Sequence, residues 1–232
     1  MALDERLALL AELERTDEAS GAELAEIDEL SAAVAEIHRQ AVELHELLAR
    51  LPEERDAAAR AVDESGRELA DAKDALRRAE EELAAAEAGD DPERVVAARR
   101  FKVRARDHVH IAERKAAVAR AHASDLAARA DAAQVQVAEL ETRARELAKV
   151  LEQRPRLTED AVATPGPGPA EVAEWATRAR AALLVARSQL ADERDAVVRQ
   201  ANELGAVLLG EEIPATSAAA VARRVERELD SP

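Results

Sequence analysis

The sequence predicts an all-α protein: a long antiparallel coiled-coil hairpin with a small helical bundle at its base. Three observations predict this fold: a composition dominated by Ala, Leu, Glu and Arg, two sustained heptad repeats, and a strong turn signal between them. Of the 232 residues, 47% are hydrophobic and 35% charged, but only 1% are aromatic. Such a composition is typical of long helices and coiled coils.

Apolar residues recur at alternating spacings of three and four residues in two long segments, which is the pattern of a coiled-coil seam. In the first segment 16 of 18 such positions are apolar, and in the second 16 of 17. The first seam comprises Ile27, Leu30, Val34, Ile37, Ala41, Leu44, Leu48, Leu51, Arg55, Ala58, Val62, Ser65, Leu69, Ala72, Leu76, Ala79, Leu83 and Ala86. The second comprises Val95, Ala98, Lys102, Ala105, Val109, Ala112, Ala116, Ala119, Ala123, Leu126, Ala130, Ala133, Val137, Leu140, Ala144, Leu147 and Leu151.

The two seams complement each other when the chain folds back so that facing residue numbers sum to 181. Large side chains then tend to face small ones, as in Leu83 with Ala98 and Leu48 with Ala133, which keeps the distance between the helices constant. We therefore expect arms at about 24–88 and 93–153, each roughly 90 Å long at 1.5 Å per residue.

The turn chemistry at 89–92 agrees with a hairpin. Gly89 is expected to adopt a left-handed conformation at the end of the first arm, Asp91 to cap the second helix, and Pro92 to occupy its first position. Pro52 interrupts the first arm, but the heptad phase is preserved across it. We therefore predict one kinked helix rather than a break.

The remaining segments are expected to build the base. Residues 1–22 should form an N-terminal helix that packs at the base of the hairpin (23–154), and 155–169 a linker rich in Pro and Gly. Residues 170–232 should be a helical segment, with a helix over 170–209 and a short one over about 216–230. Their apolar faces should bury against the open end of the hairpin or against a second copy of the chain.

Charge is unevenly distributed along a chain whose net charge is −16. Residues 53–88 sum to −6 and residues 93–129 to +6. The basic stripe at 94–129 supports two interpretations: ion pairs with the acidic facing arm, or contacts to a nucleic-acid backbone. The candidate nucleic-acid contacts are Arg99, Arg100, Lys102, Arg104 and Arg106.

Asp90 and Asp91 place two carboxylates at the predicted hairpin tip. An acidic tip on a long hairpin resembles the Gre-type transcript-cleavage factors, and that resemblance implies tip carboxylates that reach a metal in the RNA polymerase active site. It covers four or five residues, the arms here are longer, and the family's second domain has no counterpart. The alternative is that Gly-Asp-Asp-Pro simply forms a turn and a helix cap.

Most other function classes find little support in the sequence. There is no Cys, which excludes disulfides and thiolate chemistry. His38, His45, His108, His110 and His122 lack metal-ligand spacing, and no nucleophile or phosphate-binding motif occurs. We therefore expect no enzyme activity, no cofactor and no metal. No run is apolar enough to cross a membrane, so a cytoplasmic protein is expected.

The sequence thus predicts a coiled-coil scaffold, adaptor or spacer that contacts other proteins or a second copy of itself. The alternative is a nucleic-acid-associated or transcription-linked coiled-coil protein. Candidate partner contacts are Asp90, Asp91, Phe101, Ile111 and Trp175. Trp175 could equally be a core residue where its helix docks. Apolar residues that flank the second seam exceed the need of a two-stranded pair, which predicts a further helix or chain over Val96, Phe101, Val103, Ile111 and Val118.

Overall fold

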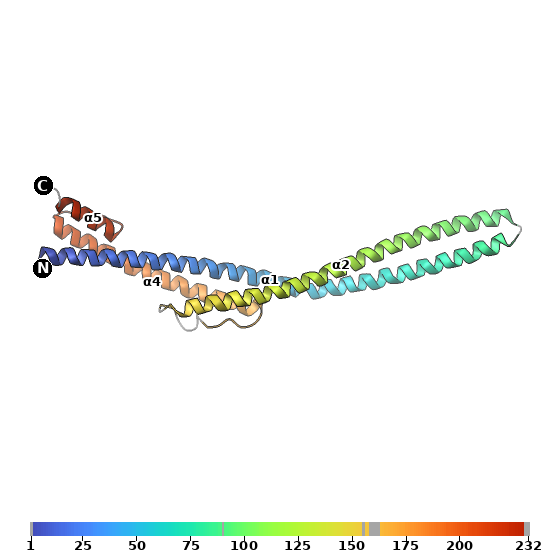
Figure 1. Ribbon diagram of the computed structural model, residues 1–232, viewed down its shortest axis with the longest axis horizontal. Coiled ribbons are helices and arrows are strands. Elements are labelled where there is room, and N and C mark those ends of the chain that lie inside the picture. The colour runs from blue at the N-terminus through green and yellow to red at the C-terminus, as the bar shows by residue number, and fades with distance from the viewer. Residues whose placement is uncertain (1, 90, 155, 158–162, 230–232) are drawn as a thin grey trace. The chain divides into compact units, whose positions relative to one another are not determined.

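The computed structural model describes residues 2–89, 91–154, 156–157 and 163–229. Over these residues the protein is helical, with no strand. Its helices are α1 (Leu3–Glu87), α2 (Pro92–Glu152), α4 (Pro169–Leu209) and α5 (Ala218–Leu229) (Figure 1). The chain divides into two units, residues 43–138 and residues 1–42 with 139–232.

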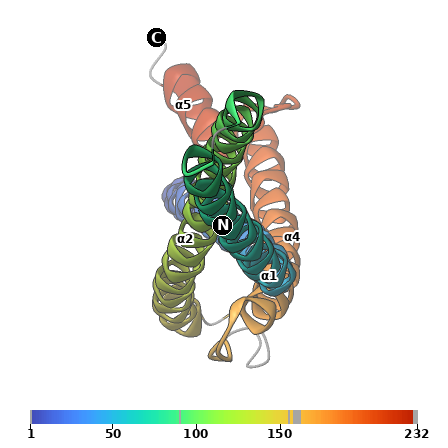
Figure 2. The ribbon, with the colours of Figure 1, turned by 90° about the vertical axis from the view of Figure 1, so that its right-hand side faces the viewer.

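In residues 43–138, segments of α1 and α2 lie side by side on either side of the turn (Figures 1 and 2). Burial follows the predicted seam. From Val95 to Val137, every seam position of α2 is buried or half-buried and every other residue is exposed. A buried cluster joins Leu51 and Ala58 of α1 to Leu126 and Ala133 of α2.

Helix α1 continues through Pro52 without a break, and Pro52 itself is exposed. Because proline has no N–H, the Leu48 carbonyl lacks its intrahelical donor at this point. Helix α1 also continues through Gly21, so residues 3–22 belong to the same helix as the predicted first arm.

Asp91, in the turn between the two long helices, caps the N-terminus of α2. Its Oδ1 accepts hydrogen bonds from the backbone N–H groups of Glu93 (3.1 Å) and Arg94 (3.3 Å), so the predicted cap is confirmed. The expected left-handed conformation of Gly89 is wrong, because only Gly168 and Gly210 have positive φ among the described residues. The Gly89 N–H instead donates to the Ala86 carbonyl (3.2 Å), which tightens the last turn of α1 without a left-handed residue.

The second unit, residues 1–42 with 139–232, is held by the apolar face of α4. Nine residues of this face are buried: Val172, Trp175, Ala176, Ala179, Leu183, Ala186, Leu190, Ala201 and Gly205. Helix α5 packs on α4, and both share a cluster with Leu10 and Leu13 of α1. Helices were expected over 170–209 and about 216–230, and α4 and α5 lie there.

Candidate interaction surface

The candidate partner contacts differ in their accessibility. Asp90 lies outside the described residues, and Asp91 is exposed but uses its side chain as a helix cap. Phe101 and Ile111 are exposed on α2, by 45% and 49%. Trp175 is fully buried, which agrees with its interpretation as a core residue. Phe101 and Ile111 therefore remain the accessible apolar contacts of this set.

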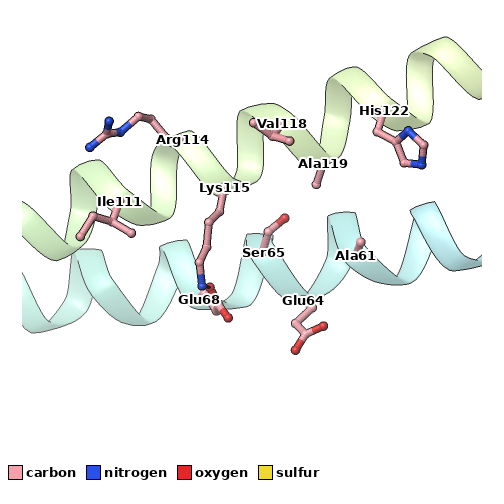
Figure 3. A pocket seen from close by; sticks show the side chains of 10 residues that line it. All are labelled: Ala61, Glu64, Ser65, Glu68, Ile111, Arg114, Lys115, Val118, Ala119 and His122. Carbon is pink, nitrogen blue, oxygen red and sulfur yellow. Dashed lines mark hydrogen bonds and ion pairs between the residues drawn. The ribbon is translucent and has the colours of Figure 1, made fainter.

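A shallow groove runs between α1 and α2 within residues 43–138 (Figure 3). Its floor contains Ser65 and Ala119, two small residues at seam positions, and its α2 wall carries Ile111 and Val118. The small seam side chains leave space between the helices, which accounts for a groove at this place. Val118 is 69% exposed and Ile111 49% exposed, so this wall offers apolar surface to solvent.

Charged side chains border this groove. Lys115 Nζ of α2 lies 2.9 Å from Glu68 Oε2 of α1, and Figure 3 shows Lys115 reaching across to Glu68. Two further ion pairs cross between these helices nearer the turn, Lys102 with Glu80 (3.1 Å) and Arg99 with Glu87 (3.1 Å). All three lie at the surface, although Lys102 is half-buried, so each stabilises the pairing only slightly.

The basic stripe is therefore only partly neutralised by the facing helix. Arg99 and Lys102, two of the five candidate nucleic-acid contacts, are paired. Arg100, Arg104 and Arg106 are exposed and have no ion pair within the described residues. The same holds, across the described part of 94–129, for Arg94, Arg114, Arg120 and Arg129. Unpaired cations on one segment make it a candidate for binding an acidic partner.

Ion pairs in the other unit connect the chain segment after α2 to α1 and α4. Arg156 bridges Glu23 of α1 (3.1 Å) and Glu193 of α4 (2.8 Å), and Arg154 pairs with Glu26. The hydrogen bonds from Arg156 lower the pKa of Glu193, and Arg187 likewise lowers the pKa of Asp28. Arg154 and Arg156, with Glu23 and Glu26, line a pocket of about 10 Å³, which is room for one water molecule at most.

Asp17 is a buried structural residue that the sequence patterns did not reveal. It is buried in the second unit, where Oδ1 accepts from Arg194 Nε (2.7 Å) and Oδ2 accepts from the backbone N–H of Ala218 (2.9 Å). A carboxylate on α1 thus caps the first turn of α5, 201 residues away. Such a contact leaves no local sequence signal, because the capping residue is far from its helix in the sequence.

Comparisons with known proteins give no relative: no family model, no curated protein and no solved structure matches the chain. Over the described residues, no group of three or more His, Cys, Asp or Glu side chains is arranged to hold a metal ion. None of the described helices combines the length and hydropathy that a membrane span requires.

Proposed function

We propose that this chain is a non-enzymatic scaffold, adaptor or spacer, in which α1 and α2 form an antiparallel coiled-coil hairpin that presents its outer faces to protein partners. The observation that carries the proposal is the burial pattern of α2 between Val95 and Val137, where only seam positions are withdrawn from solvent. A two-helix seam uses all its buried surface for its own pairing. The outer faces, with Phe101, Val103 and Val118, remain for other molecules.

The groove between α1 and α2 and the pocket at Arg156 support a binding role more than a catalytic one. Small-molecule sites are usually concave and enclose most of their ligand. The groove at Ile111 is shallow and open, and the pocket at Arg156 has space for one water at most. Surfaces of this shape suit an extended protein partner.

Site-specific photo-crosslinking in the source cells tests the proposal. A photoreactive residue at the exposed position Phe101 or Val118 should give discrete crosslinked proteins, and one at the buried position Trp175 should give none above background. The Trp175 position is the control, because it distinguishes contact at the surface from general reactivity of the photoreactive group. A chain that crosslinks to nothing from Phe101, Val118 or any other exposed position on either unit would contradict a scaffold role.

A second function is favoured by one observation, the unpaired arginines of the basic stripe. Arg100, Arg104 and Arg106 can approach a phosphate backbone without first losing an ion pair. We therefore keep nucleic-acid association as the alternative. It predicts binding to DNA or RNA that weakens steeply between low and moderate salt, and weakens further when these three residues are changed to Glu. Absence of binding at low salt would remove this alternative.

A further inference from the structure

The groove between α1 and α2 exposes apolar surface in the middle of residues 43–138. Ile111 is 49% exposed and Val118 69% exposed, and both lie beside the small side chains of Ser65 and Ala119. Burying these side chains against another molecule removes apolar surface from water and so favours association. Large residues beside a hollow floored by small ones can interdigitate with another helix pair that has the same features.

The two sides of the groove carry opposite charge. The α1 side belongs to a segment of net charge −6, and the α2 side to one of net charge +6. Asp71 on α1 and Arg114 on α2 are exposed and have no ion pair within the described residues. Because Lys115 pairs with Glu68, Arg114 and Asp71 lie within about one helical turn of the same level along the helices. The surface is therefore complementary to itself.

Only one of the two symmetric ways to stack this face on a second copy matches the charges. With the two-fold axis across the helices, α2 would lie on α2 of the second copy, basic on basic. With the axis along the helices, each α2 lies on α1 of the other copy, basic on acidic. Like charges placed opposite each other cost free energy, whereas opposite charges favour the pairing. The second arrangement puts both turns at the same end.

We infer that residues 43–138 associate groove to groove with a second copy of this chain, α2 of each copy against α1 of the other, with the two turns at the same end. Ile111 and Val118 of one copy then fill the hollow of the other, and Arg114 faces Asp71 across the interface. The inference deepens the proposed function by naming a partner, and it rests on the proposed hairpin. The distance between labels on Ala57→Cys and Ser124→Cys within one chain tests the hairpin alone, so failure of the hairpin and failure of the association are distinguishable.

Sedimentation of the full chain over a range of micromolar concentrations tests the association. The wild-type chain should form a dimer, and Val118→Asp should weaken it by about tenfold or more, equivalent to about 1.4 kcal/mol. Val135→Asp is the matched control, because Val135 is 58% exposed on α2 but does not line the groove. Helicity measured on all three chains shows whether they are folded.

Charge reversal tests the facing pair. Arg114→Glu and Asp71→Arg should each weaken the dimer several-fold, and the double variant should recover most of the loss, as expected for residues that interact directly. If the dimer affinity lost in the double variant equals the sum of the two single losses, expressed as free energies, the assigned contact is contradicted.

The substitution Ala88→Cys introduces a single cysteine into a chain that has none. A nitroxide label on it tests the relative orientation of the two copies. Turns at the same end place the two labels within about 30 Å, because packed helices are 8–10 Å apart. Opposite orientation would separate them by about 70 Å, since each turn lies 23 residues beyond Ser65 at 1.5 Å per residue. A chain that stays monomeric, a dimer insensitive to Val118→Asp, or the longer distance would each overturn the inference. A monomer that instead binds another protein at Val118 would assign the groove to that partner.

Discussion

Gly205 and Gly66 lie inside helices in opposite surroundings. A Cβ at Gly205 would come within 2.6 Å of Val221 Cγ1 and 2.7 Å of Ile213 Cδ1, whereas one at Gly66 would meet nothing within 4 Å. Ala is favoured over Gly inside a helix by about 1 kcal/mol. We expect Gly66→Ala to raise the free energy of unfolding by roughly that amount, and Gly205→Ala to lower it by about 1–3 kcal/mol through overpacking.

Thermal or denaturant unfolding of the two variants checks this prediction. The pair serves as its own control, because the same substitution is made in the same secondary structure. A stabilising Gly205→Ala would show that α5 does not pack closely on α4 at this point.

Asp17 connects three helices through one carboxylate. Replacing it by Ala removes the partner of the Arg194 guanidinium and the cap of the Ala218 N–H. We expect Asp17→Ala to lower the free energy of unfolding by about 2 kcal/mol, since a buried donor loses its acceptor. Asp63→Ala, at an exposed position on α1, should have little effect. Equal effects of the two changes, measured by denaturant unfolding, would contradict the cap.

The pH dependence of stability follows from Glu193. Its pKa is lowered in the folded state, chiefly by its hydrogen bond with Arg156. A lowered carboxyl pKa stabilises the fold above the unfolded value of 4.5, and this contribution is lost as the pH falls through the lower folded value. Glu193→Gln should therefore melt below the wild-type chain at pH 7, and the gap should narrow as the pH falls below 4.5 and through the lower folded pKa. A gap that is unchanged at low pH would exclude the ion pair as its cause; Glu54→Gln is the exposed control.

At the scale of elements, the pairing of α1 with α2 predicts how the chain tolerates shortening. In the proposed register, in which facing residue numbers sum to 181, residues 76–82 and 99–105 face each other, and each segment is one heptad long. Deleting both should preserve the phase of the seam and leave a cooperative unfolding transition. Deleting 76–82 alone leaves seven residues of α2 without partners on one side of the turn, and should lower the melting temperature markedly.

Circular dichroism melts of the two deletion variants make this comparison. Equal stability of the single and double deletions would contradict the proposed register. The ion pair of Lys102 with Glu80 is lost in both variants, so it does not account for a difference between them.

The sequence predicted the helices of this protein better than their packing. Heptad spacing is a local property, and it correctly identified the residues that α2 buries between Val95 and Val137. Turn chemistry at Asp91 was likewise local and was confirmed. By contrast, Asp17 meets Ala218 across 201 residues, and no local pattern encodes which distant helix a face will meet.

The candidate surface was predictable only in part, for a related reason. Exposed apolar residues such as Val118 were apparent because they exceed the need of one seam. The division of the basic stripe into paired and unpaired cations was not, because it depends on the level at which side chains such as Lys115 and Glu68 meet. The register places ion-pair partners only to within one helical turn. That is too coarse to say which arginine pairs with which carboxylate.

At the scale of the whole molecule, every proposal above depends on α1 and α2 pairing antiparallel within one chain. The most direct measurement is the distance between nitroxide labels on Ala57→Cys and Ser124→Cys, two exposed positions whose numbers sum to 181. Labelled protein is diluted with unlabelled chain so that only distances within one chain contribute. The proposed hairpin predicts a distance below about 35 Å, since paired helices lie 8–10 Å apart. A distance near 100 Å, the length of 67 helical residues in line, would contradict it.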